Sequence, residues 1–345
     1  MADRISIREL ATIAGVSRTT VSLALRGSHE VSEATRHRIH ELAREHDYRC
    51  HPAINALMQQ VGRGRRVHDQ EVIAFVRSGP DAGERAQGQL EILAGASEEA
   101  HRLGYRLEVF WAGYKAAKAE QLGRVLYHRG IRGVIWGSMP FPHPPVNFPW
   151  QHFAPIACTL STGVHRLPTV ATDYASGMAM VIDELARRGA RRIGIIGNSV
   201  EDSRLNHGWA LGLHLYLLRG GTVPVTSTYM AGPPGRQAMR ECIREQKPDV
   251  VIMPQSFFAE TPFLEGIIPR VSLDVPTAEL GKSAGLYQNA TQIGRHSVRS
   301  LAIRLSNGIL GLPEHPFSVV SQASFVEGKS LGDVLVKGIN RAVDM

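Results

Sequence analysis

The hydrophobic pattern of the chain changes character near residue 70. Before this point, apolar residues recur every three or four positions in short segments, which predicts helices over 7–14, 18–25 and 33–46. After it, short apolar runs alternate with amphipathic segments, which predicts strands that alternate with helices. The chain therefore divides into a small helical domain and a larger α/β body.

The helices of the first domain have recognisable start signals. Ser6 with Glu9 three residues later forms a capping box, and Ser17 and Ser32 precede the second and third helices as N-caps. Gly15 supplies a tight turn between the first two helices. Two short helices joined by such a turn, with a third packed beneath them, predict a helix-turn-helix unit.

The second helix leaves an unusual set of side chains outside the predicted core. Its apolar residues point inward, while Arg18, Thr19, Ser22 and Leu23 face out. Arginine can bond both acceptors of guanine in the major groove, and threonine can bond base edges or contact a thymine methyl group. We therefore expect this helix to read DNA. The alternative is a structural three-helix bundle with a polar face.

Two series of strands are predicted in the body. Strand-like runs occupy 71–76, 105–111, 133–138 and 155–159, and a second series begins near Val170 with runs at 192–197, 226–230, 249–253 and 267–274. Helices are predicted over 175–188, 203–218 and 235–246. Two consecutive series of this kind predict two parallel-sheet lobes with helices on both faces. Ligands of such sheets bind at the carboxyl ends of the strands, so a cleft between the lobes is the expected site.

Composition and charge add two points. The chain has 345 residues, 43% of them hydrophobic, and a formal net charge of +7. Residues 1–68 contain eleven arginines, no lysine and seven acidic residues, which favours a polyanionic partner or else a solvated basic face. Neither an apolar run of membrane-spanning length nor a signal-peptide pattern is found, and three cysteines far apart suit free thiols. We therefore expect a cytoplasmic protein with no membrane partner.

No catalytic motif is apparent. The stretch GIIGNSVEDSR fits neither of the two phosphate-loop motifs, G-x-G-x-x-G and G-x-x-x-x-G-K-[ST]. The nucleophile-elbow, zinc-protease and paired-cysteine motifs are also missing from the sequence. His143 and His152 flank a proline-rich loop, which favours rigid surface structure over a metal site. We therefore expect no enzymatic activity, no metal and no cofactor.

The segment SIRELATIAGVSRTTVSLALRGSHEVSEATRHRIHELAREHDYR resembles the DNA-binding headpiece of the LacI/GalR family of transcriptional regulators. The resemblance implies that Arg18, Thr19 and Leu23 read bases. It also implies phosphate contacts, which position the domain without specifying sequence, from Ser6, Ser17, Ser22, Arg26, Ser32 and Thr35.

The stretch YRCHPAINALMQQVGRGRR that follows resembles the hinge helix of the same family. In that family the hinge folds on operator DNA and inserts leucines into the minor groove. The resemblance implies minor-groove contacts from His51, Ile54 and Leu57. An ordinary linker with incidental apolar residues is the alternative.

The body resembles the effector domain of the family, a periplasmic-binding-protein-like pair of lobes. The resemblance is carried by VATDYASGMAMVIDELARRGARRIGIIGNSVEDSRLNHGWALGL and by YQNATQIGRHSVRSL. It implies a headpiece over 1–49, a hinge and linker over 50–68, and an effector and dimerisation domain over 69–345. The first lobe would comprise about 70–167 and 288–318, and the second about 168–287 and 319–330.

Five polar residues are candidates for the effector pocket, each with a structural role as the alternative: Ser78, Thr159, Arg204, Asp274 and Gln288. The sequence thus predicts a homodimeric repressor of pseudo-palindromic operator DNA whose affinity depends on a sugar-like or polyol effector. Two alternatives remain at this stage. One is a ligand-binding or metabolic α/β protein with an incidental headpiece, and the other is an architectural DNA binder that needs no effector.

Overall fold

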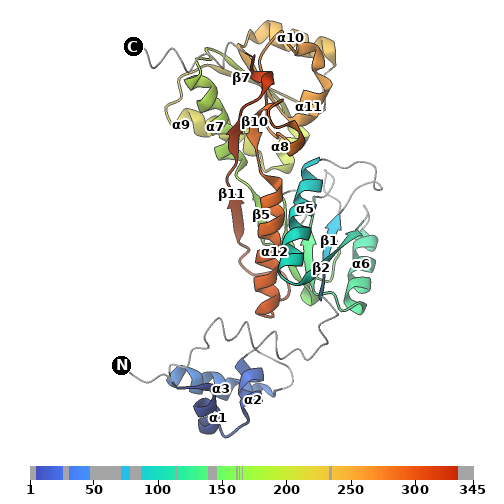
Figure 1. Ribbon diagram of the computed structural model, residues 1–345, viewed down its shortest axis with the longest axis vertical. Coiled ribbons are helices and arrows are strands. Elements are labelled where there is room, and N and C mark those ends of the chain that lie inside the picture. Colours follow the sequence, from blue (N-terminus) through green and yellow to red (C-terminus); the bar gives the residue numbers. More distant parts are fainter. Residues whose placement is uncertain are drawn as a thin grey trace.

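The structure is a computed structural model that describes residues 5–25, 31–46, 71–77, 87–112, 116–138, 146–160, 162, 164, 166–232 and 235–332 (Figure 1). Several predicted features lie outside the described residues: Arg26, the linker over 50–68 with His51, Ile54 and Leu57, the pocket candidate Ser78, His143, and the chain beyond Gly332.

The headpiece consists of three helices at the predicted positions, α1 (Ile7–Ala14), α2 (Arg18–Leu25) and α3 (Glu33–Glu45). Each helix contacts the other two. Leu10, Val21 and Ile39, one from each helix, are essentially inaccessible to solvent and form the centre of a small core. Burial of one apolar stripe from each short helix stabilises all three, because helices of this length are marginal alone.

The predicted caps are present. Ser6 accepts a hydrogen bond from the Glu9 amide while the Glu9 carboxylate accepts one from the Ser6 amide, which completes the capping box. The Ser17 and Ser32 hydroxyls accept hydrogen bonds from the amides three residues on, at 3.0 and 3.3 Å. Gly15 ends α1 with φ at 64°, a left-handed conformation that glycine adopts without steric cost.

The first lobe is built on a six-stranded parallel sheet in the order β11-β5-β4-β3-β1-β2. Helices cover both faces of the sheet, so the apolar residues of its strands are divided between two cores, one on each face. One core contains residues of α5 and α12, and the other contains residues of α6. The elements are β1 (Glu71–Arg77), α5 (Gln87–Arg102), β2 (Tyr105–Trp111), α6 (Ala116–His128), β3 (Gly133–Trp136), the 3₁₀ turn η1 (Trp150–His152), β4 (Ala154–Ala157), β5 (Thr169–Thr172), α12 (Ala290–Ser306) and β11 (Ser318–Ser321).

The second lobe has a six-stranded sheet in the order β12-β10-β9-β8-β6-β7, parallel except for the β10–β12 pair. One core lies between the sheet and helices α7 and α9, and the other contains residues of α10 and α11. The elements are α7 (Tyr174–Arg187), β6 (Ile193–Asn198), α8 (Ser199–Arg204), α9 (Gly208–Leu218), β7 (Val225–Met230), α10 (Arg236–Gln246), β8 (Val250–Met253), α11 (Gln255–Glu260), η2 (Pro262–Leu264), β9 (Arg270–Ser272), η3 (Thr277–Glu279), β10 (Ala284–Tyr287), β12 (Ser324–Val326) and η4 (Lys329–Leu331).

The two-lobe prediction is confirmed, and the chain passes between the lobes three times: after β5, after β10 and between β11 and β12 (Figure 1). The expected lobe boundaries need two corrections. Strand β5 belongs to the first sheet because it pairs with β4, although the sequence placed residues 169–172 in the second lobe. Strand β11 also belongs to the first sheet, because it pairs with β5 along its full length.

The single helix predicted over 203–218 is wrong. The chain forms α8, then a turn, then α9, because Asn206 and His207 adopt positive φ angles of 53° and 57°. Such angles cannot continue a right-handed helix. Among the described helices, none is both long enough and apolar enough to cross a membrane.

Candidate functional site

Helix α2 presents the polar face that the sequence predicted. Arg18 and Thr19 are exposed in its first turn, whereas Val21 and Ala24 on the opposite side are buried in the headpiece core. Leu23 is half-buried and packs against that core, so only part of its side chain is accessible. The exposed end of α2 can therefore present a guanidinium and a hydroxyl to a base edge.

The three capping serines have a role that needs no DNA. Ser6, Ser17 and Ser32 each cap a helix, and Ser17 and Ser32 lie 2.8 Å from the hydroxyls of Thr20 and Thr35. All three serines are exposed, and each stands at a helix N-terminus, where amide groups and the helix dipole favour anions. The caps thus account for the serines structurally and place them where a phosphate can be bound.

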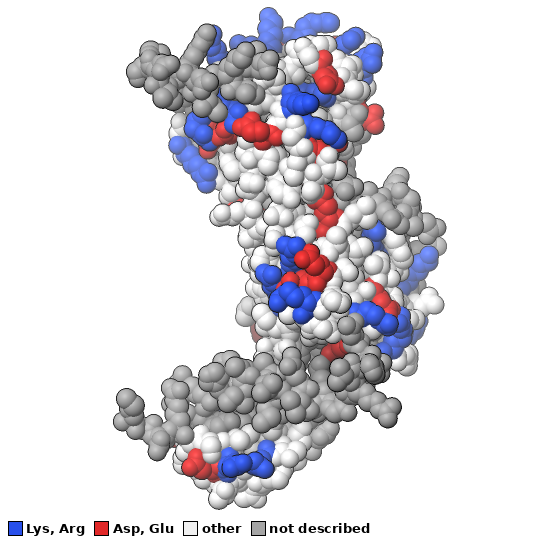
Figure 2. Space-filling view, in the orientation of Figure 1, with Lys and Arg blue, Asp and Glu red and all other residues white. Residues whose placement is uncertain are grey.

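The body has mixed charge on the face shown in Figure 2. Basic and acidic side chains are interspersed there over both lobes. Arg295 with Glu98, and Arg299 with Glu99, illustrate this pairing on the first lobe.

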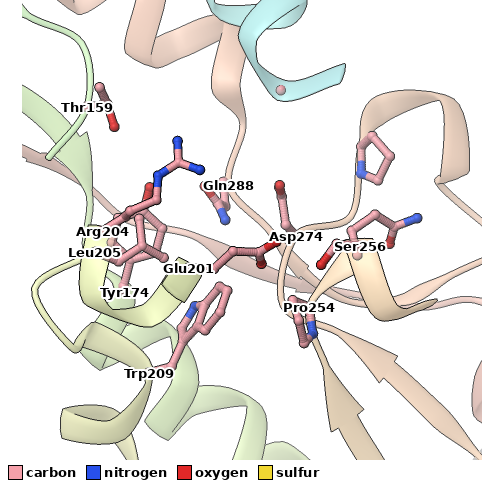
Figure 3. A pocket seen from close by; sticks show the side chains of 13 residues that line it. Thr159, Tyr174, Glu201, Arg204, Leu205, Trp209, Pro254, Ser256, Asp274 and Gln288 are labelled. Atoms are coloured by element: carbon pink, nitrogen blue, oxygen red, sulfur yellow. The ribbon is translucent and has the colours of Figure 1, made fainter. Parts of the chain in front are cut away.

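The expected cleft exists. A cavity of about 410 Å³ lies between the lobes, and its walls come from the carboxyl ends of strands and the segments that follow them (Figure 3). Four candidate residues from the sequence line it together: Thr159, Arg204, Asp274 and Gln288. A smaller adjoining cavity of about 180 Å³ shares all four and extends along the first lobe. The volume of the larger cavity is within the usual range for small-molecule sites.

Asp274 is the most unusual group in the cavity. It follows β9, and its amide donates a hydrogen bond to the Ser272 hydroxyl at 3.2 Å. Its carboxylate forms no hydrogen bond or ion pair with any described residue. Burial, together with the charges of the nearby Glu91 and Glu201 carboxylates, raises the pKa of Asp274 to about 7.

Helix α8 supplies two more charged groups. Glu201 and Arg204 lie one turn apart, and both side chains reach into the cavity (Figure 3). Burial raises the pKa of Glu201, while a hydrogen bond from Ser256 and the charge of Arg204 oppose this shift. Arg204 donates a 2.6 Å hydrogen bond to Ser138 of the first lobe.

A buried carboxylate holds α8 and α9 in place. Asp202 is only 2% exposed and accepts a 2.9 Å hydrogen bond from the Trp209 amide at the start of α9. Burial raises the pKa of Asp202, although bonds from the amides of Trp209 and Ala210 work against this. The hydrogen bond from Trp209 to Asp202 fixes the turn at 205–207 and thereby directs the cavity-lining residues of α8.

Gln288 has a structural role at the crossover between the lobes. Its amide nitrogen donates to the Leu273 carbonyl at 3.2 Å, and its amide oxygen accepts from the Thr172 hydroxyl at 3.4 Å. The side chain therefore links the ends of β5 and β9 while it also lines the cavity. Thr159 lines the cavity from the first lobe.

Sequence reasoning missed several cavity residues, among them Tyr174, Glu201, Trp209 and Ser256. Glu201 could have been found, because it follows the predicted strand at 192–197, where ligand groups of parallel sheets gather. Ser256 belongs to a short helix after β8 whose polar residues give no distinguishing signal.

The described residues contain no group of three or more His, Cys, Asp or Glu side chains that could hold a metal ion. Cys158 and Cys242 are free and buried, and burial raises the pKa of Cys158 to about 12, which makes its thiol a poor nucleophile.

Comparison with known proteins gives results for both parts of the chain. A family model described as bacterial regulatory proteins, lacI family, matches residues 6–51. A search of curated proteins by sequence finds no match.

Solved structures resemble nearly the whole chain. The transcriptional regulator CelR in complex with cellobiose is 20% identical, with a TM-score of 0.53, over 94% of this chain and 99% of that one. The lac repressor dimer bound to operator and the anti-inducer ONPF is 18% identical, with a TM-score of 0.51, over 94% and 98%. A LacI-family regulatory protein from Chloroflexus aggregans is 18% identical, with a TM-score of 0.57, over 76% and 98%.

At these identities the structural likeness establishes the fold of the body, and the family match establishes the kind of headpiece. Residues 6–51 match the model of the lacI family of bacterial regulatory proteins, and the chain resembles in fold the LacI-type regulators whose structures are known.

Proposed function

We propose that the protein is a sequence-specific transcriptional repressor that binds operator DNA as a homodimer and releases it in response to a small polar effector bound between the lobes. The observation that carries the proposal is the combination, in one chain, of an exposed Arg18–Thr19 pair on α2 and a polar cavity between two lobes.

DNA recognition is assigned to α2. Its rear face is fixed by Val21 and Ala24 in the headpiece core, so the exposed first turn is held rigidly enough to enter a groove. Arg18 and Thr19 would contact base edges, and the capping serines would contact phosphates that fix the register. Leu23 can add an apolar contact only through its accessible half.

Effector control is assigned to the interlobe cavity. Both walls carry polar groups, so a ligand that contacts both binds one arrangement of the lobes more tightly than another. The first lobe follows the headpiece and linker in the chain, and a shift of two first lobes in a dimer would alter the spacing of two headpieces. Ligand binding and DNA binding are coupled through the free-energy difference between the lobe arrangements. The ligand therefore changes the affinity for DNA by the same factor by which DNA changes the affinity for the ligand.

Selection of binding sites from random duplex DNA with the full-length protein tests the proposal. We expect an enriched sequence of two inverted half-sites, because a two-fold symmetric dimer reads a pseudo-palindrome. Metabolites added to the complex should include one that lowers the affinity for this site. Failure to enrich any sequence would contradict the assignment of α2, and binding unaffected by every metabolite would favour an effector-independent DNA binder.

A further inference from the structure

We propose that the interlobe cavity takes an aminated polyol or amino sugar, whose protonated amino group lies between the carboxylates of Glu201 and Asp274. The inference rests on the proposed effector site and adds the chemical class of its ligand.

Two carboxylates of the second lobe line the acidic end of the cavity, and a third, from the first lobe, lies near it. Glu201 extends from α8 across the cavity floor toward Asp274, and both side chains line the same space (Figure 3). Glu91, on α5 of the first lobe, accepts a 2.8 Å hydrogen bond from the Thr277 amide and lies close enough to Asp274 to affect its ionisation. No described basic side chain forms an ion pair with any of these three residues.

The arginine of the cavity serves its other end. Arg204 donates to the Ser138 hydroxyl on the first lobe, and its guanidinium lies between Thr159 and Gln288 in Figure 3. The charge of Arg204 opposes the rise in the pKa of Glu201. The pKa of Asp274, in contrast, is raised by burial and by the two glutamates. Among the described residues the cavity is therefore polarised, with hydrogen-bond donors near Thr159 and Ser138 and acceptors near Asp274 that no ion pair neutralises.

A half-buried carboxylate with acidic neighbours and no ion-pair partner is unfavourable when it is ionised, and a cation placed beside it reduces this cost. The rise in the pKa of Asp274 to about 7 agrees with this geometry. An ammonium group has three donors and can bond Glu201 and Asp274 together, whereas a hydroxyl has one donor and no charge.

Gly88 and Asp274 line the cavity side by side. A Cβ atom at Gly88 would lie 3.9 Å from Asp274 Oδ2, so the glycine is the first-lobe residue that stands beside the carboxylate. Tyr174 and Trp209 supply aromatic walls, and Gln255 with Thr159 supplies polar groups for hydroxyls. A volume of about 410 Å³ suits a ligand of sugar size.

Calorimetric titration of the full-length protein with matched pairs of ligands tests the inference. Each pair consists of an amino-hexitol or amino-hexose and the parent compound in which a hydroxyl replaces the amino group; glucamine and sorbitol are one such pair. At pH 8 we expect the best aminated member to bind at least about tenfold more tightly than its parent, as a charge-assisted bond between desolvated groups predicts.

Three variants test whether the preference for the aminated ligand comes from Asp274 and Glu201. Asp274→Asn and Glu201→Gln, which preserve shape, should each reduce the preference for the amine. Glu260→Gln removes an exposed carboxylate of the same lobe outside the cavity lining and serves as the matched control. The preference of the unmodified protein should also weaken as the pH falls from 8 to 6, because Asp274 takes up a proton in this range.

The inference is overturned if parent polyols bind as tightly as their amines, if no aminated member binds, or if Glu260→Gln has the same effect as Asp274→Asn. These results can be distinguished from failure of the proposed function. A neutral polyol that releases DNA would contradict the proposed amine ligand and support control of DNA binding by an effector. An amine that binds at the cavity without changing DNA affinity would retain the ligand class and refute effector control.

Discussion

The Arg204 guanidinium donates a 2.6 Å hydrogen bond to the Ser138 hydroxyl, and this bond joins the second lobe to the first across the cavity. A second polar contact, from the Thr277 amide to the Glu91 carboxylate at 2.8 Å, joins the lobes through α5. Both contacts involve residues at or beside the cavity. A ligand that bonds to Arg204 or displaces Glu91 therefore acts directly on the contacts that hold the lobes together.

The Arg204–Ser138 bond can be tested by a double-mutant cycle with Arg204→Ala and Ser138→Ala. A hydrogen bond to a charged group predicts a coupling free energy of about 1.5–3 kcal/mol in chemical unfolding of the body. Additive effects of the two substitutions would show that the bond does not contribute to closure of the lobes.

Asp274→Asn should stabilise the protein at neutral and higher pH. The folded-state pKa of Asp274 is raised from 3.8 to about 7, so folding favours the protonated form and stability falls as the pH rises between these values. The variant lacks this loss, and its advantage should reach on the order of 4 kcal/mol above pH 7 and vanish below pH 4. Urea unfolding across this range measures it. Lower stability of the variant at pH 8 would show that the carboxylate is a structural group.

Asp202→Ala should destabilise the second lobe and disturb the cavity. The substitution leaves the Trp209 amide at the start of α9 without its buried acceptor, at a cost of about 1–3 kcal/mol. Thermal unfolding measures the loss, with Glu260→Ala as a control on an exposed carboxylate. An unchanged melting temperature would mean that the turn between α8 and α9 holds without the Asp202 hydrogen bond.

The oligomeric state follows from the length of the recognition surface. A single headpiece reads too few base pairs for strong specificity, so we expect a dimer. The segment SLGDVLVKGINRAVDM has apolar residues without sustained heptads, which argues against a tetramer assembled through the tail. Light scattering at micromolar concentration should give twice the mass of the chain. A monomer, or a tetramer that depends on the tail, would each contradict this expectation.

The headpiece could be predicted nearly residue by residue because its signals are local. Capping hydroxyls, a glycine turn and apolar spacing fixed all three helices, and the structure places their ends within one residue of the expected positions. The short strands β11 and β12 gave no comparable signal. β11 is an edge strand whose residues alternate between exposed and half-buried positions, so no continuous apolar run marks it.

The cavity could be predicted only in part. Arg204 and Asp274 were found because they follow strands at the edge where ligand groups gather. Glu201 was missed because the helix of this region was expected to begin at residue 203, and the positive φ angles at Asn206 and His207 that divide it have no glycine to signal them. The structural role of Gln288 at the crossover between the lobes depends on contacts with Thr172 and Leu273, which are distant in sequence.

The most direct test of the central claim is the affinity of the Arg18→Ala protein for the selected operator and for random DNA of the same length, measured by fluorescence anisotropy at one salt concentration. Arg44→Ala, which removes an exposed arginine from α3, is the control for lost positive charge. If α2 reads sequence, Arg18→Ala costs about 1–3 kcal/mol on the operator and little on random DNA, whereas Arg44→Ala leaves the ratio of the two affinities unchanged. Equal weakening of Arg18→Ala on both DNAs would contradict base reading by Arg18 and reassign it to the phosphate backbone.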